Sequence, residues 1–174
     1  MQELMTQEQL EQEAKELCKW AAARAGVIVV APLVGSMALI ANEVYMVSRL
    51  AKLHGKNLSD GAILGFIGAF AGTIAGQTLT TLIPFAPLQI PIGMGVTYAL
   101  GIAAHEWLKA GCPSDMSAFQ NVFDRAKEEA KNMIPLLKKD PRKELPLGDE
   151  SRKYSLKQLE TNDKGVNGNG GEKL

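Results

Sequence analysis

The residues that could carry nucleophilic, acid–base or metal chemistry are two histidines, His54 and His105, and two cysteines, Cys18 and Cys112. A nucleophilic triad or a zinc site needs such side chains at spacings that converge on one point. Neither histidine has a cysteine, serine or carboxylate at a spacing typical of those sites, and both cysteines are interpreted as small apolar packing residues. A phosphate-binding Gly-x-x-x-x-Gly-Lys-Ser/Thr loop is also missing from the sequence. We therefore expect no catalytic residue, metal ligand or cofactor, and a protein that is not an enzyme.

Polar side chains interrupt a stretch of 45 residues, 61–105, that contains no charged side chain. At helical spacing several of them share a face, which we interpret as a polar seam. The seam consists of Thr73, Gln77, Thr81 and His105, with Thr97 beside it. In a membrane the Gln77 amide would hydrogen-bond across a helix pair, and a water-filled path through an oligomer is the alternative.

Small residues form the most specific pattern in the chain. Five glycines recur every three or four positions, and a second small-residue set with spacing of four follows them. The first set is Gly61, Gly65, Gly68, Gly72 and Gly76, and the second is Gly93, Thr97 and Gly101. Small residues let helix backbones approach closely in a membrane, so both sets are predicted to mediate helix packing. Packing within one chain and self-association through the stripe are both left open.

The elements that would position these residues are two apolar helices, 61–83 and 88–108, joined by the proline-rich sequence PFAPLQIP. A helix of 23 residues is about 34 Å long, enough to cross a hydrocarbon core of about 30 Å. Helices joined so briefly must be antiparallel neighbours, so a transmembrane hairpin is predicted. The side chains of Trp20, Glu106 and Trp107 would then lie at the membrane interface.

Two segments precede this hairpin. Over 6–24 apolar side chains recur at helical spacing, and Thr6 with Gln9 forms a capping box at the start. The uncharged segment 25–42 contains Pro32, which predicts a kink or a break close to it. Whether this segment makes an additional membrane span is left open.

Amphipathic helices are expected on both sides of the hairpin. One covers 39–54, ends at Gly55 and has a polar side formed by Asn42, Glu43, Arg49 and Lys52. The other begins after Pro113 and ends at Pro135. The sequence beyond it has few large apolar residues, so a flexible tail is predicted.

The predicted fold class is therefore all-α, a glycine-rich antiparallel transmembrane hairpin flanked by amphipathic helices and a disordered C-terminal tail. Its parts are an N-terminal helix, 1–24, a hydrophobic membrane domain, 25–112, an amphipathic helix, 113–135, and the tail, 136–174. Basic residues before and after the hairpin place the termini in the cytoplasm by the positive-inside tendency. The chain is therefore expected to be an integral, multi-pass membrane protein.

Composition excludes two other classes of protein. Nineteen basic residues balance nineteen acidic ones, which leaves no surplus of positive charge for a nucleic-acid binder. Two cysteines are too few for a disulfide scaffold.

Over 41–111 the chain resembles the YcjF-like family, a GTPase-associated helical domain of unknown function. The resemblance rests on ANEVYMVSRLAKLHGKNLS and TYALGIAAHEWLKAG, the first with a Met-x-x-Arg-Leu-Ala-x-x-x-Gly core from Met46 to Gly55. The sequence APLVG at 31–35 is similar to the proline-containing turn of the family but lacks its usual acidic residue. Members often sit beside or are fused to a GTPase domain and are associated with membranes, which implies a possible GTPase partner in trans.

Three hypotheses follow. The leading one is a non-enzymatic membrane anchor, adaptor or scaffold, in contact with lipids, that docks a partner through 114–134 and the tail. The second is a pore-forming or channel-like oligomer lined by the polar seam. The third is a soluble helical domain in which the hairpin is a buried core.

Overall fold

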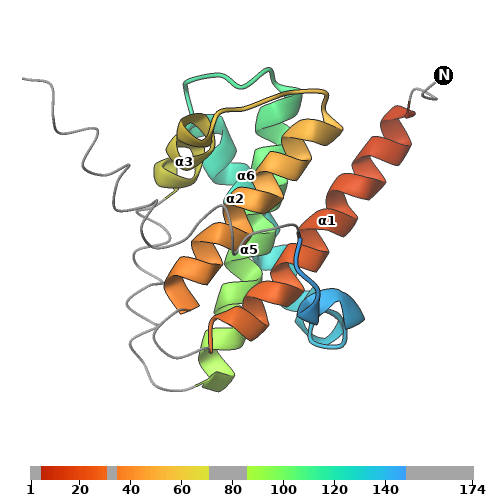
Figure 1. Ribbon diagram of the computed structural model, residues 1–174, viewed down its shortest axis with the longest axis vertical. Coiled ribbons are helices and arrows are strands. Elements are labelled where there is room, and N and C mark those ends of the chain that lie inside the picture. Colours follow the sequence, from red (N-terminus) through yellow and green to blue (C-terminus); the bar gives the residue numbers. More distant parts are fainter. Residues whose placement is uncertain (1–4, 31–34, 71–85, 148–174) are drawn as a thin grey trace, which may run out of the picture.

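The computed structural model describes residues 5–30, 35–70 and 86–147, and within these ranges every regular element is helical. The elements are α1 (Gln7–Ile28), α2 (Gly35–Leu53), α3 (Asp60–Ala69), α5 (Ala86–Lys109), α6 (Ser117–Leu137) and the short 3-10 helix η1 (Pro141–Glu144). Figure 1 shows α1, α2, α5 and α6 packed as a bundle, with the short α3 beside α2. The all-α prediction is confirmed.

Helix α1 begins as its sequence predicts. The Thr6 hydroxyl accepts a hydrogen bond from the Gln9 backbone at 3.2 Å, and the Gln9 side chain accepts one from the Thr6 backbone at 2.8 Å. This capping box satisfies two N–H groups that the first turn leaves unpaired. The predicted apolar face is buried from Ala14 to Ala21. The helix continues to Ile28, beyond residue 24, where it was expected to end.

Helix α2 ends as predicted, because Gly55 has the left-handed backbone conformation, with φ +66°. Its polar side is different from the prediction. Asn42 and Glu43 were expected to face solvent, but their side chains are only 1% and 3% exposed. The helix lies between α1 and α5, which cover the face that carries them. The Asn42 side chain donates a hydrogen bond to the Ala21 carbonyl across this contact at 3.0 Å.

Helix α5 is the central element of the bundle and contacts α1, α2 and α6. On α6, Phe119, Phe123, Ala126 and Ala130 form the predicted apolar face and are buried. The Phe123 ring lies 5.3 Å from the ring of Phe70, which caps the end of α3. The prediction that Pro135 ends this helix is wrong, because α6 continues to Leu137 with the proline inside its last turn. At that position a proline removes only one backbone hydrogen bond.

The expected integral, multi-pass membrane protein is corrected by this structure. Among the described residues no helix combines the length with the apolar character that a bilayer span demands. Helix α3 has 10 residues and is about 15 Å long, half the thickness of a hydrocarbon core. Helix α5 has 24 residues but is covered by α1 and α6, which carry charged side chains. The connector PFAPLQIP was also misplaced, because α5 already begins at Ala86.

The tail was predicted to begin at residue 136, and this is wrong for its first part. Residues 138–147 run from the end of α6 through η1, and η1 packs against α1. Leu147 is buried within the core. The rest of the predicted tail, 148–174, lies outside the described residues.

The two small-residue sets do not pack against each other where they are described. A Cβ atom added to Gly101 would lie 2.6 Å from the Cys18 Sγ and 2.8 Å from the Met46 Sδ, so this glycine faces α1 and α2. Gly93 faces Val29 of the segment that follows α1. A Cβ atom on Gly65 or Gly68 of α3 meets no described residue within 4 Å. Gly72, Gly76, Thr73, Gln77 and Thr81 lie outside the described residues.

A pair of substitutions tests this correction. Gly101→Val is expected to lower the free energy of unfolding by about 1–3 kcal/mol, because the added methyl groups overpack the contact with Cys18 and Met46. Gly65→Ala is expected to raise it by up to about 1 kcal/mol, since alanine favours a helix where space is open. Urea unfolding followed by circular dichroism measures both. Destabilisation by Gly65→Ala would restore the predicted role of the first glycine set.

Candidate functional site

A polar cluster lies at the end of the bundle where α1 begins and where α2 and α5 end (Figure 1). We define it by Glu11, His54, His105, Glu106 and Lys109. The His105 Nε2 lies 3.0 Å from the Glu11 Oε2, and its Nδ1 lies 3.0 Å from the His54 Nε2. The Lys109 ammonium donates to Glu11 at 2.6 Å and to Glu106 at 3.2 Å. One imidazole, two carboxylates and one ammonium therefore converge on a single point.

The burial of the cluster is uneven. The His105 side chain is 2% exposed, whereas the side chains of Glu11, Lys109 and Glu106 are 30%, 33% and 39% exposed. A buried imidazole thus forms the floor, and the charged groups form a rim that reaches solvent.

The charges of the cluster shift the pKa values of its members. The hydrogen bond from Lys109 is the main cause that lowers the pKa of Glu11 to about 2; burial opposes it, and the contact with His105 adds to it. The same bond with Glu11 raises the pKa of Lys109. Burial, followed by the neighbouring His105, lowers the pKa of His54. At neutral pH Glu11 is therefore ionised and His54 is neutral.

Two kinds of chemistry are compatible with this geometry. One oxygen of Glu11, one nitrogen of His105 and one oxygen of Glu106 all lie within 4.8 Å of one another, a set of donors that can bind a metal ion. An imidazole oriented by a carboxylate is also part of a nucleophilic triad. Among the described residues, however, no hydroxyl or thiol hydrogen-bonds to His54 or His105.

Sequence reasoning missed this cluster because its members are far apart in the chain. His105 is 94 positions from Glu11 and 51 from His54. The available signal was that each residue lies near one end of a helix, and only the packing of the helices brings these ends together.

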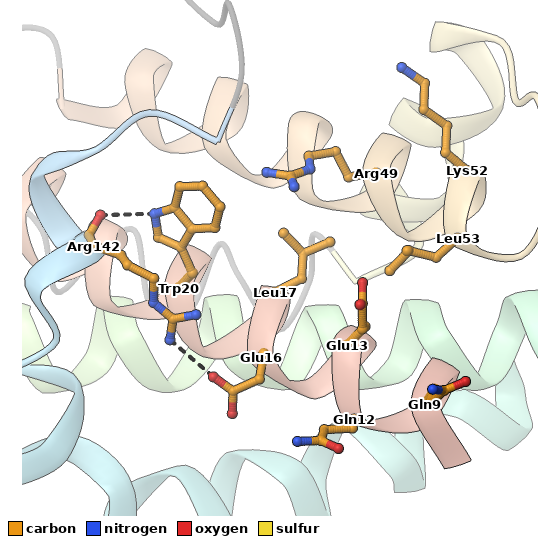
Figure 2. Close-up of a pocket in the computed structure, with 10 residues that line it drawn as sticks. All are labelled: Gln9, Gln12, Glu13, Glu16, Leu17, Trp20, Arg49, Lys52, Leu53 and Arg142. Carbon is orange, nitrogen blue, oxygen red and sulfur yellow. Dashed lines mark hydrogen bonds and ion pairs between the residues drawn. The ribbon is translucent and has the colours of Figure 1, made fainter. Parts of the chain in front are cut away.

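A groove with a volume of about 630 Å³ opens between α1, α2 and η1. Figure 2 shows the apolar side chains of Leu17, Trp20 and Leu53 facing this opening. The polar side chains around them are Gln9, Gln12, Glu13 and Glu16 from α1, Arg49 and Lys52 from α2, and Arg142 from η1. One edge is thus acidic and the opposite edge is basic.

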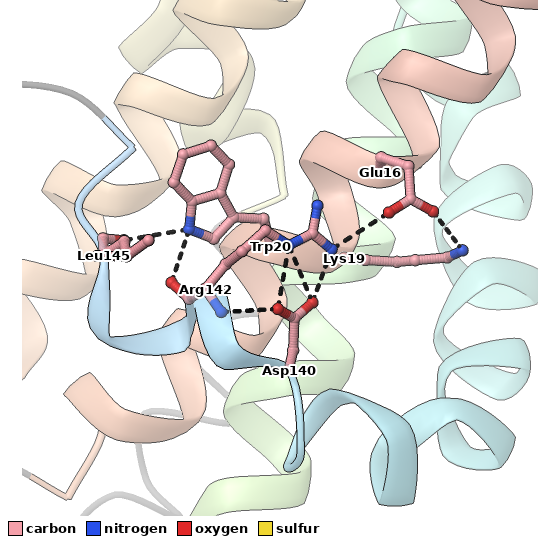
Figure 3. Close-up of polar contacts among 6 residues, drawn as sticks. All are labelled: Glu16, Lys19, Trp20, Asp140, Arg142 and Leu145. Carbon is pink, nitrogen blue, oxygen red and sulfur yellow. Dashed lines mark hydrogen bonds and ion pairs between the residues drawn. The ribbon is translucent and has the colours of Figure 1, made fainter.

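Trp20 is fixed in the wall of this groove. Its Nε1 donates to the backbone carbonyls of Arg142 at 2.8 Å and Leu145 at 3.1 Å, as Figure 3 shows. The guanidinium of Arg49 lies 5.1 Å from the Trp20 ring and that of Arg142 lies 6.0 Å from it, both within the range of cation–π attraction. The segment around η1 is thereby anchored to α1.

The basic groups of the groove differ in how they are neutralised. The Arg142 guanidinium pairs with Asp140 at 2.7 Å and with Glu16 at 3.2 Å (Figure 3). Arg49 donates to the carbonyl of Leu147 at 2.8 Å, a neutral acceptor. Within the described part of the chain neither Arg49 nor Lys52 forms an ion pair with a carboxylate. The α2 edge therefore carries uncompensated positive charge.

A third polar group lies inside the bundle. The Thr97 hydroxyl of α5 donates to the Glu43 carboxyl of α2 at 3.3 Å, and both side chains are buried. Burial raises the pKa of Glu43 to about 7, while the bond from Thr97 lowers it. The carboxyl is enclosed by the bundle, so it affects stability more directly than ligand binding.

The remaining predicted site residues have contacts within the bundle. His105 and Thr97 share the face of α5 on which they were predicted, but they bond to α1 and α2 in place of a partner helix of a hairpin. The predicted interface residue Trp107 is buried, donates to the Pro113 carbonyl at 2.9 Å and packs on Phe66. Glu106 belongs to the polar cluster. No described contact of these residues, nor of Trp20, supports a membrane interface.

Comparisons of the chain with known protein families, curated proteins and solved structures find no match. The resemblance to the YcjF-like family therefore stays a prediction.

Proposed function

We propose that this protein is a small helical adaptor whose groove between α1, α2 and η1 binds a segment of a partner protein with acidic and apolar side chains. The observation that carries the proposal is the uncompensated charge of Arg49 and Lys52 beside the apolar side chains of Trp20, Leu17 and Leu53. An acidic side chain would pair with the α2 edge, and an apolar one would cover the floor.

The groove has the features of a surface built for recognition. Its volume lies within the range of binding pockets, and tryptophan and arginine are the residues that dominate protein interfaces. Because η1 holds the Trp20 indole in place, little side-chain entropy is lost when a partner covers it.

This surface replaces the docking helix expected from the sequence. The apolar face of α6 packs on α5, and Phe123 contacts Phe70 at the end of α3, which favours the groove over this face as the docking surface. The basic α2 edge favours a partner segment that carries carboxylates, because these would pair with Arg49 and Lys52.

A selection from a displayed library of random peptides tests the proposal. We expect the peptides that bind to be enriched in Asp or Glu next to an apolar residue. Lys52→Glu is expected to weaken their binding at least about tenfold, since it places a like charge against the peptide. Lys52 is exposed, so the substitution leaves the core intact.

Arg125→Glu on α6 is the matched control, because it makes the same charge change on an exposed residue outside the groove. Fluorescence polarisation with the selected peptides should give the same affinity for this variant as for the parent protein. Selected peptides without acidic residues, or equal binding to Lys52→Glu, would contradict the proposal. Binding of inorganic phosphate at the same residues with no selected peptide would replace it with a small-anion site.

A further inference from the structure

We infer that the polar cluster is a binding site for a divalent transition-metal ion, with Glu11, the Nε2 of His105 and Glu106 as ligands. Lys109 acts there as a built-in competitor that occupies the site when the metal is absent. This inference concerns residues that do not line the groove and does not depend on the proposed function.

The distances are close to those that coordination needs. With metal–ligand distances of about 2.1 Å, two ligands of a tetrahedral ion lie about 3.4 Å apart. The Glu11 Oε2 and the His105 Nε2 are already 3.0 Å apart, and the oxygen of Glu106 completes a triangle with no side longer than 4.8 Å. Rotation of the exposed Glu106 side chain can close the remaining gap.

His54 would support the proposed ligand His105 by contacting the ring nitrogen that does not bind the metal. A metal-bound histidine usually donates its other ring N–H to a hydrogen-bond acceptor, which fixes its tautomer and orientation. Once the Nε2 of His105 binds the metal, its Nδ1 carries the proton and faces the His54 Nε2 at 3.0 Å.

Exchange of Lys109 for a divalent cation changes how the two carboxylates are neutralised. The carboxylates of Glu11 and Glu106 both face the Lys109 ammonium in the protein as described. If the Lys109 side chain swings into solvent, a divalent cation would neutralise both carboxylates. Lys109 is one third exposed and its four-carbon chain is flexible, so this exchange needs no movement of the backbone.

The mixture of donors defines the class of metal. One imidazole and two carboxylates suit borderline ions such as Zn²⁺, and Co²⁺ is a spectroscopic substitute with similar geometry. Three protein ligands leave at least one position for water, and the exposed rim gives the ion a path from solvent.

Titration of the full chain with Zn²⁺ after dialysis against a chelator tests the site. We expect one equivalent of Zn²⁺ to bind by calorimetry, and Co²⁺ to give the visible bands of a four- or five-coordinate ion. Lys109→Met is expected to tighten binding at least about tenfold, because it removes the competing ammonium. A merely structural ion-pair network would not respond in this direction.

His105→Asn is expected to weaken Zn²⁺ binding by more than a hundredfold, since a ligand contributes more than the 10–100-fold effect of a supporting residue. His54→Gln is expected to weaken it within that smaller range. Circular dichroism verifies that each variant is folded. Unchanged or weaker binding by Lys109→Met would overturn the inference even if His105→Asn fails to fold. A thiolate-to-cobalt charge-transfer band would also overturn it, by placing the metal on a cysteine.

Discussion

Glu43→Gln is expected to raise the free energy of unfolding by about 3 kcal/mol at pH 8 and to leave it nearly unchanged at pH 4. The folded pKa of Glu43 is about 7, whereas the pKa of an exposed glutamate is 4.5. Below pH 4.5 the carboxyl is protonated in both the folded and the unfolded state. Between pH 4.5 and 7 the unfolded chain releases this proton and the folded chain retains it. Wild-type stability therefore falls as pH rises through this window and reaches its full loss above pH 7.

Urea unfolding of both proteins at a series of pH values measures this effect. Other groups titrate too, so the informative quantity is the difference between the two curves, which should grow between pH 4.5 and 7. Glu128→Gln is the matched control, because Glu128 is largely exposed and pairs only with its helical neighbour Lys131 among the described residues. Parallel curves for Glu43→Gln and the parent protein would show that the buried carboxyl costs nothing.

Local features of this fold were predictable from the sequence. The capping box at Thr6 and the left-handed Gly55 each involve residues within one turn of the chain, so their signals are local. The apolar faces of α1 and α6 were also predicted correctly, because helical periodicity states which side chains share a face.

What covers each face could not be predicted in the same way. Asn42 and Glu43 have the chemistry of surface residues, and periodicity gives no sign that α1 and α5 enclose them. The polar cluster depends likewise on the docking of three helix ends. A site of this kind becomes visible only when the tertiary arrangement is known.

The membrane prediction was wrong for a related reason. An uncharged helix has the same composition whether lipid or protein covers it. In α5 the cover is provided by α1 and α6, whose buried apolar side chains pack against the central helix. Thr97 and His105 then find polar partners on α1 and α2. In α5 the lack of charged side chains before Glu106 therefore goes with burial by other helices and was a poor indicator of a membrane span.

Phe123→Ala is expected to lower the free energy of unfolding by about 3–5 kcal/mol. The Phe123 side chain is fully buried, and its ring packs against Phe70. Truncation would leave a cavity between α6 and the end of α3 that the helices cannot fill by moving together. Leu136→Ala is the control on the same helix, because Leu136 is 72% exposed, and it should change stability by less than about 0.5 kcal/mol.

Chemical denaturation of the two variants also decides between two roles for α6. If its apolar face belongs to the core, as the contact between Phe123 and Phe70 indicates, Phe123→Ala weakens the isolated protein and affects peptide binding only through the folded fraction. If that face instead served to dock a partner, the isolated Phe123→Ala variant would retain nearly full stability and lose binding. Peptide binding measured without urea, together with the urea unfolding curve of each variant, separates these outcomes. A stable variant that no longer binds the selected peptides would move the adaptor surface from the groove back to α6.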